Sequence, residues 1–160
     1  TNWLKEYFIL LMETMEKHIM LSIQRDFDML FREWFNILID DENLQARIDA
    51  TFTPVIEQNT YETSYDYLSG GEKTSIALAY RLALNKIINN ISEDIKTKDI
   101  LILDEPTDGF STEQLDKVRD VLAELNLKQT IIVSHEEKIE SFVDMTIRVV
   151  KDRHVSHIIP

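Results

Sequence analysis

The first 39 residues constrain the fold most, because they have the spacing of one long helix. Apolar side chains recur every three or four positions from residue 3 to residue 39, and neither glycine nor proline interrupts the run. A helix of this length extends roughly 55 Å at 1.5 Å per residue. The residues that define its apolar stripe are Leu4, Phe8, Leu11, Met15, Ile19, Ile23, Phe27, Leu30, Trp34 and Leu38.

A helix this long overhangs a small domain, so part of it should pack outside the core. One interpretation is an amphipathic helix lying on the domain's own sheet. The favoured one is the root of a coiled coil that enters the domain. We expect coiled-coil character near the start and core packing near Trp34–Leu38. Because the helical pattern is already under way at Thr1, we also expect the chain to be part of a longer protein.

Composition narrows the class of protein. A chain of 160 residues can form one domain with a substantial core. The absence of cysteine excludes disulfides and thiolate metal sites. All apolar runs are shorter than the ~20 residues of a membrane span. The formal net charge of −12 argues against nucleic-acid binding by this chain alone, since affinity for phosphates is built from Lys and Arg.

The rest of the chain has alternating strand and helix patterns, which predict an α/β fold with a parallel sheet. Residues 48–53 alternate between apolar and polar, indicating a half-exposed strand that Pro54 interrupts, and residues 55–67 are expected to be irregular or β. Further predicted elements are helices over 72–91, 111–125 and 136–142, strands over 99–103 and 130–133, and a terminal hairpin over 145–150 and 154–159. The strands over 99–103 and 130–133 are continuously apolar, so we expect both to be buried, the first on both faces.

The segment Leu68-Ser69-Gly70-Gly71-Glu72-Lys73 opens the helix predicted over 72–91. Adjacent glycines let the backbone approach an anion closely, and the free N–H groups and positive dipole end of the helix then face that anion. Ser69 adds a hydroxyl donor at the same point. An ordinary Gly-Gly turn before a helix remains the alternative.

Two carboxylates, Asp104 and Glu105, follow the first apolar strand, and Pro106 ends its hydrogen-bond ladder. Ligands bind at the carboxyl ends of strands in open parallel sheets. Asp104 is therefore a candidate Mg²⁺ ligand, and Glu105 a candidate to position or deprotonate a water. A solvated acidic turn is the alternative. His135, after the next predicted strand, is a weaker candidate to contact a γ-phosphate or the water.

Taken in order, these motifs resemble those of the C-terminal lobe of an ABC-type ATPase head. LSGGE at 68–72 matches the signature loop, LDEP at 103–106 matches the Walker B strand, and His135 matches the H-loop. The resemblance covers roughly residues 68–136. The P-loop pattern G-x-x-x-x-G-K-[ST] is missing, because the chain's three glycines are Gly70, Gly71 and Gly109.

The long helix at the start makes the chain similar to the SMC-like ATPases, in which a coiled coil separates the P-loop lobe from the signature lobe. The Pro-Thr that follows Asp104-Glu105 and the Gly-Glu-Lys in the signature loop most resemble the Rad50-type ATPases of double-strand-break repair, partners of the Mre nuclease. This resemblance implies a coiled-coil root over 1–39 and a signature and Walker B lobe over 40–160.

The resemblance also implies a nucleotide-binding role for the signature loop. Ser69, Gly70 and Gly71 would contact the γ-phosphate of an ATP held by the P-loop of an opposite head. Glu72 and Lys73 belong to the same nucleotide-binding segment. Two interpretations of Lys73 stay open: it links nucleotide state to movement of the lobe, or it is a solvated lysine at a helix start.

For the second motif, the resemblance implies that Asp104 serves Mg²⁺, that Glu105 is the general base, and that His135 senses the γ-phosphate. One departure concerns the D-loop after Walker B, which commonly ends in Leu-Asp. Ser111 stands where that aspartate is expected. One interpretation is that Asp108 or the Ser111 hydroxyl substitutes for it, and the simpler one is that Ser111 caps the next helix.

The implied function is ATP hydrolysis in DNA break repair, with the chain inactive alone. Activity would require the P-loop lobe of the same protein and a head-to-head homodimer that sandwiches two ATPs. The implied partners are a Mre-type nuclease that binds at the coiled-coil base and DNA that is bound through the assembled complex. No membrane is expected as a partner. Depending on the organism, the protein would be associated with the nucleoid in the cytoplasm, or it would lie in the nucleus.

Two alternatives stay open. In the first, the chain is chiefly an interaction module that docks a nuclease partner through Trp3, Tyr7 and Phe8, since aromatic side chains anchor interfaces. In the second, it is the nucleotide domain of another SMC-like or ABC protein. A transporter domain, for example, would have its P-loop upstream without a long coiled coil.

Overall fold

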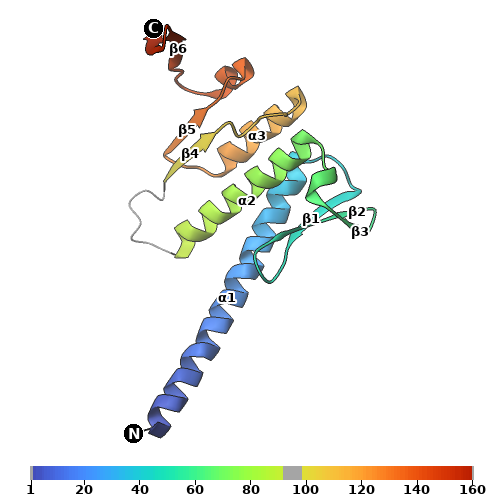
Figure 1. Ribbon diagram of the computed structural model, residues 1–160, viewed down its shortest axis with the longest axis vertical. Helices are drawn as coiled ribbons and strands as arrows, with labels where there is room; N and C mark the ends of the chain where they lie inside the picture. Colours follow the sequence, from blue (N-terminus) through green and yellow to red (C-terminus); the bar gives the residue numbers. More distant parts are fainter. Residues whose placement is uncertain (1, 92–98, 160) are drawn as a thin grey trace.

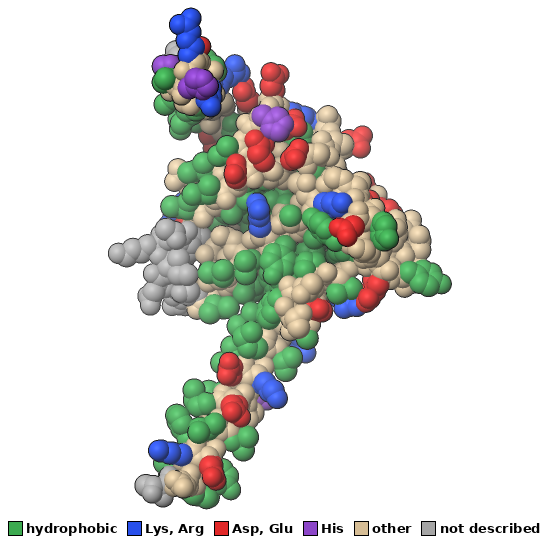
Figure 2. Space-filling view, viewed as in Figure 1, with side chains coloured by type: hydrophobic (Ala, Val, Ile, Leu, Met, Phe, Trp, Pro, Cys, Tyr) green, Lys and Arg blue, Asp and Glu red, His purple; other side chains and the backbone are tan. Residues whose placement is uncertain are grey.

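The computed structural model describes residues 2–91 and 99–159 and consists of an α/β body from which one long helix projects (Figure 1). Helix α1 spans Asn2–Leu38, as its periodicity predicts. Residues 2–22 are exposed, and the view in Figure 2 shows apolar side chains along this overhang. The end of the helix packs into the body, which confirms the core packing predicted near Trp34–Leu38. Its buried side chains are Phe27, Phe31, Trp34, Phe35 and Leu38.

An antiparallel sheet follows, with the strand order β1-β2-β3. Its strands are β1 (Leu44–Ile48), β2 (Pro54–Gln58) and β3 (Tyr61–Thr63). The strand predicted over 48–53 is therefore wrong, because the chain turns there. The Asp49 carboxylate accepts the backbone N–H groups of Thr51 at 2.8 Å and Thr53 at 2.9 Å, and Phe52 has a φ of 62°. Pro54 does not interrupt a strand but begins one, where no ladder N–H is required.

The second half of the chain is the predicted α/β unit. Strands β4 (Ile100–Asp104) and β5 (Gln129–Val133) pair in parallel, and helices α2 (Gly70–Ile91) and α3 (Thr112–Glu124) pack with β4 in one hydrophobic core. No helix within residues 2–91 and 99–159 is both long and apolar enough to cross a membrane. Two short 3-10 turns flank these elements, η1 (Tyr65–Tyr67) before α2 and η2 (Glu137–Phe142) after β5.

The prediction that these strands are buried, β4 on both faces, is wrong. Leu101 and Leu103 are buried, but Ile102 between them is 66% exposed, and β5 has no buried residue. The physical reason is that helices pack on one face of the two-stranded sheet, and no described element covers the other face. Apolar side chains of β4 and β5 therefore remain in contact with solvent.

The chain ends in the predicted hairpin, formed by β6 (Arg148–Asp152) and β7 (Val155–Ile159). Its first strand begins at Arg148, later than predicted. Every residue of both strands is exposed, and the hairpin projects from the body (Figure 1). An ion pair of 2.8 Å between Arg148 and Glu140 connects it to η2.

Candidate functional site

The predicted glycine-rich loop leads directly into α2, and its flanking polar residues cap that helix. The Glu72 N–H donates to Ser69 Oγ at 3.3 Å, and the Ser69 N–H donates to the Glu72 carboxylate at 2.7 Å. This reciprocal pair is a capping box, which satisfies two helix-end donors. Ser69 Oγ accepts in this pair, so its O–H remains able to donate. The Ser-x-x-Glu spacing in the sequence could have revealed the cap.

The two glycines of the loop have different surroundings. A Cβ at Gly71 would lie 3.1 Å from the Gly109 carbonyl oxygen and 3.1 Å from Gln114 Oε1, whereas a Cβ at Gly70 would meet nothing within 4 Å. Gly109 itself has a φ of 77°, a conformation that favours glycine. Gly71 therefore allows α2 to approach the loop after β4, and Gly70 keeps the outer side of the helix start open.

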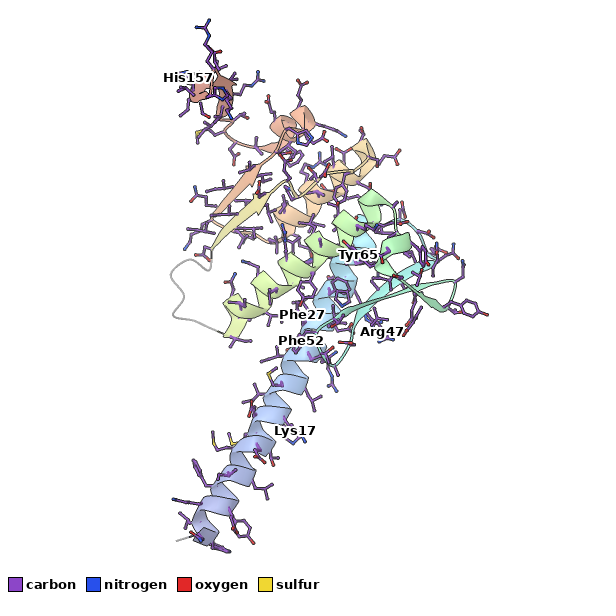
Figure 3. All side chains as sticks on the ribbon, viewed as in Figure 1. Lys17, Phe27, Arg47, Phe52, Tyr65 and His157 are labelled. Atoms are coloured by element: carbon purple, nitrogen blue, oxygen red, sulfur yellow. The ribbon has the colours of Figure 1, made fainter. Side chains whose placement is uncertain are left out.

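Lys73 is held against the turn that precedes the loop. Its Nζ donates to the Asp66 carbonyl oxygen at 3.1 Å and lies 5.6 Å from the centroid of the Tyr65 ring. The Tyr65 hydroxyl donates to the Lys73 carbonyl oxygen at 3.3 Å. Figure 3 shows Tyr65 close to the start of α2. These contacts join α2 to η1, and a role in lobe movement stays a prediction.

At the carboxyl ends of β4 and β5, Glu105 and His135 meet. The Glu105 N–H donates to the Val133 carbonyl oxygen at 2.8 Å, and Glu105 has a φ of 44°, an unusual conformation for a residue with a side chain. Its Oε2 lies 2.9 Å from His135 Nδ1. The hydrogen bond and negative charge of Glu105 raise the pKa of the His135 imidazole above its ordinary value.

The start of α2 and the end of β4 share a hollow of about 230 Å³. Its lining includes Lys73, Asp104, Glu105 and Asp108, so the structure brings together residues from both sequence motifs. It also includes Arg81, which the sequence analysis did not single out. The spacing of eight residues between Lys73 and Arg81, which places them on one helix face, was the available signal.

Ser111 caps α3, as the simpler interpretation of the D-loop predicted. The Gln114 N–H donates to Ser111 Oγ at 3.3 Å, and the Ser111 N–H donates to Gln114 Oε1 at 3.0 Å. Asp108 is bound by α2, because its carbonyl oxygen accepts from the Thr74 hydroxyl at 2.8 Å. Whether either residue replaces the usual D-loop aspartate stays a prediction.

The donor set suits a magnesium nucleotide whose phosphates and waters supply most of the ligands of the ion. Asp104 presents an exposed carboxylate at the strand end. No group of three or more His, Cys, Asp or Glu side chains gathers as a metal site in the described parts of the chain. Mg²⁺ is commonly bound by one or two carboxylates, with phosphates and waters as its other ligands. The open side of Gly70 leaves room for a phosphate at the start of α2.

Comparison with known sequences gives Rad50 ATPases of several archaea among the relatives. The chain is 33% identical over 123 residues to the DNA double-strand break repair Rad50 ATPase of Thermoplasma acidophilum, a match that covers 73% of this chain and 12% of that protein. It is 36% identical over 89 residues to the same ATPase of Pyrococcus abyssi, covering 54% of this chain and 9% of that protein. No protein-family model matches. The chain spans only a small part of these relatives and of others like them, 9–16% of their own length.

Solved structures show the same fold. The Smc head domain with a coiled coil and joint from Pyrococcus yayanosii has a TM-score of 0.74 at 20% identity, covering 96% of this chain and 30% of that one. A chain from a study of ATP-driven dimerization of SMC ATPases has a TM-score of 0.68 at 20% identity, covering 89% and 88%. The fold is therefore that of part of an SMC head domain. Together with the sequence relatives, it identifies the chain as a Rad50/SMC-like C-terminal lobe.

The two glycines provide a matched pair of variants. Gly71→Ala should lower the free energy of unfolding by about 1–3 kcal/mol, because the new methyl group presses on the Gly109 backbone. Gly70→Ala should leave it within about 1 kcal/mol, because its Cβ has open space. Urea unfolding of the two variants measures the difference. Equal losses of stability would contradict this account of the loop.

The pair of Glu105 and His135 predicts a titration difference. Glu105→Gln should lower the pKa of His135 toward its ordinary value, as followed by NMR of the imidazole protons. Glu136→Gln is the control and should lower it less, because Glu136 is the smaller influence. Since folding raises this pKa, the pair stabilises the fold below about pH 6.5, and that contribution is lost as pH rises through the raised value. An unchanged pKa in Glu105→Gln would refute the contact.

Proposed function

We propose that this chain supplies the signature loop and the Walker B residues of a composite ATP-hydrolysis site. The observation that carries the proposal is the contact of 2.9 Å between Glu105 and His135 at the carboxyl ends of two parallel strands. The sequence relatives, which are named ATPases, support the same chemistry. The chain itself has no P-loop, so the nucleotide would be bound first by a different lobe.

The surfaces of the lobe agree with such an assembly. The exposed apolar face of β4 and β5 is suited to cover by the P-loop lobe of the same protein, because burying apolar area stabilises an assembly. The start of α2 is turned outward, with Ser69 and Gly70 accessible. These two residues would meet the γ-phosphate of a nucleotide on a second head, so that two heads enclose two ATPs.

Each side chain has a defined task in this proposal. Glu105 would accept a proton from the attacking water, and His135 would hold the Glu105 carboxylate in place. Asp104 would bind Mg²⁺, usually through water, and the ion would offset the negative charge of the phosphates. The N–H groups at the start of α2 and the Ser69 hydroxyl would donate to the γ-phosphate.

The biological role that fits best is DNA double-strand-break repair, because the relatives are named for it. We further propose an intracellular homodimer of heads, a Mre-type nuclease as partner and DNA bound through the assembled complex. The net charge of −12 makes this lobe poorly suited to bind the phosphate backbone of DNA. The main DNA contacts would therefore lie on the P-loop lobe or in the groove of the dimer. The division into a root over 1–39 and a lobe over 40–160 belongs to the same proposal.

Reconstitution tests the role of Glu105. The chain mixed with its P-loop lobe should hydrolyse ATP, and Glu105→Gln should lower kcat by at least about 100-fold, the size expected for loss of a general base. Glu124→Gln, which changes an exposed carboxylate on α3, is the control and should keep the full rate. Equal rates for the wild type and Glu105→Gln would remove Glu105 as the base.

A second function, docking of a partner on α1, is favoured by the distribution of its exposed apolar side chains. At 100° per residue, Leu4, Leu11 and Met15 lie on one side of the helix, and Trp3 and Leu10 lie more than 90° away from their centre. A two-stranded coiled coil covers a single stripe. The second group would therefore be free for a helical partner such as the nuclease.

A groove of about 420 Å³ continues this second group toward the body, between α1 and the turn after β1. Met20, Leu21 and Phe52 contribute its apolar surface. Trp3→Asp and Leu10→Asp should weaken nuclease binding at least about tenfold, because they place charge on the second apolar group. Lys5→Glu, a charge change in the same turn, is the control. Unchanged binding in both aspartate variants, measured by calorimetry with the assembled head, would argue against docking there.

A further inference from the structure

Tyr67 is the most exposed tyrosine near the signature loop. Its side chain is 85% exposed, and no hydrogen bond or ring contact to it is present among the described residues. The turn that carries it is nevertheless firmly held. The Tyr67 N–H donates to the Ser64 carbonyl oxygen at 3.1 Å, and the Leu68 N–H donates to the Tyr65 carbonyl oxygen at 3.3 Å. A large ring is therefore presented to solvent on a fixed backbone.

The ring is exposed close to Ser69, which lies two residues further along the chain. Leu68 lies between them in an extended conformation, with φ of −75° and ψ of 149°, and its side chain is buried in the core. Tyr67 and Ser69, on either side of the buried Leu68, are both exposed. Their Cα atoms are about 7 Å apart by the rise of an extended chain.

We propose that Tyr67 contacts the ribose or base of the nucleotide whose γ-phosphate meets Ser69. The inference rests on the proposed function and adds a residue to that site. If a terminal phosphate lies at the start of α2, the neighbouring parts of a nucleoside triphosphate that an aromatic ring can contact are the sugar and the base. Stacking on an aromatic ring accepts every base, because each base has a π-face. Tyr67 therefore adds affinity for nucleotides without selecting among them.

Inorganic tripolyphosphate separates this role from a merely structural one, because it has phosphates but neither sugar nor base. In the chain assembled with its P-loop lobe, Tyr67→Ala should raise the KM for ATP and for GTP about tenfold, a typical loss for one stacking contact. Inhibition of hydrolysis by tripolyphosphate should be unchanged. Tyr67→Phe should restore the wild-type KM, and Tyr61→Ala, at another exposed tyrosine on β3, is the matched control.

An unchanged KM in Tyr67→Ala would overturn the inference. An equal weakening of ATP and tripolyphosphate would also overturn it, because Tyr67 would then only shape the loop. A tenfold loss in Tyr61→Ala as well would assign the effect to the general surface. If Ser69→Arg abolishes hydrolysis while Tyr67→Ala has no effect, the composite site stands and only this inference fails. Lack of hydrolysis by the wild-type assembly would refute the proposed function and the inference together.

Discussion

The close approach of α2 to the loop after β4 is the contact on which the candidate site depends. Gly71 has no side chain, and for that reason the start of the helix can lie against the Gly109 backbone. The Thr74 hydroxyl then reaches the Asp108 carbonyl oxygen at 2.8 Å. Two sequence motifs separated by more than 30 residues are thereby brought to one end of the body, where they share a hollow. A side chain at position 71 would push them apart.

Helix α2 is also connected to the buried part of α1 through aromatic packing. The Tyr80 ring lies edge-on to Phe27, with 4.9 Å between centroids, and its hydroxyl donates to the Phe52 carbonyl oxygen at 3.1 Å. Figure 3 shows Phe27 and Phe52 beside each other at this junction. The Asp28 carboxylate also accepts the Ile48 N–H at 2.6 Å. The long helix is thus part of the core and not an appendage to it.

Much of this architecture could be predicted because its signals are local. The periodicity from Leu4 to Leu38 fixed the long helix, and the capping of α3 followed from Ser111. The strand over 48–53 was misplaced because alternation of apolar and polar residues does not reveal the turn that Asp49 closes. Burial of β4 and β5 was overestimated because an apolar sequence indicates that a strand should be covered, not what covers it.

Within the site, sequence order predicted which residues gather but not their local bonds. The left-handed conformation of Glu105 and its contact with His135 depend on the pairing of β4 with β5, which no local pattern specifies. The capping box of Ser69 and Glu72, in contrast, follows from a local signal, the Ser-x-x-Glu spacing, within a loop whose glycines also suit phosphate binding.

The central claim is that this lobe acts in trans, on a nucleotide that another head binds. The most direct measurement is the rate of ATP hydrolysis per head as the concentration of the lobe pair, this chain with its P-loop lobe, is raised. The account predicts a rate per head that rises with concentration and then levels off as heads pair, with no hydrolysis by this chain alone. A rate per head that is already constant at concentrations where the heads are monomeric, or hydrolysis by this chain alone, would contradict it.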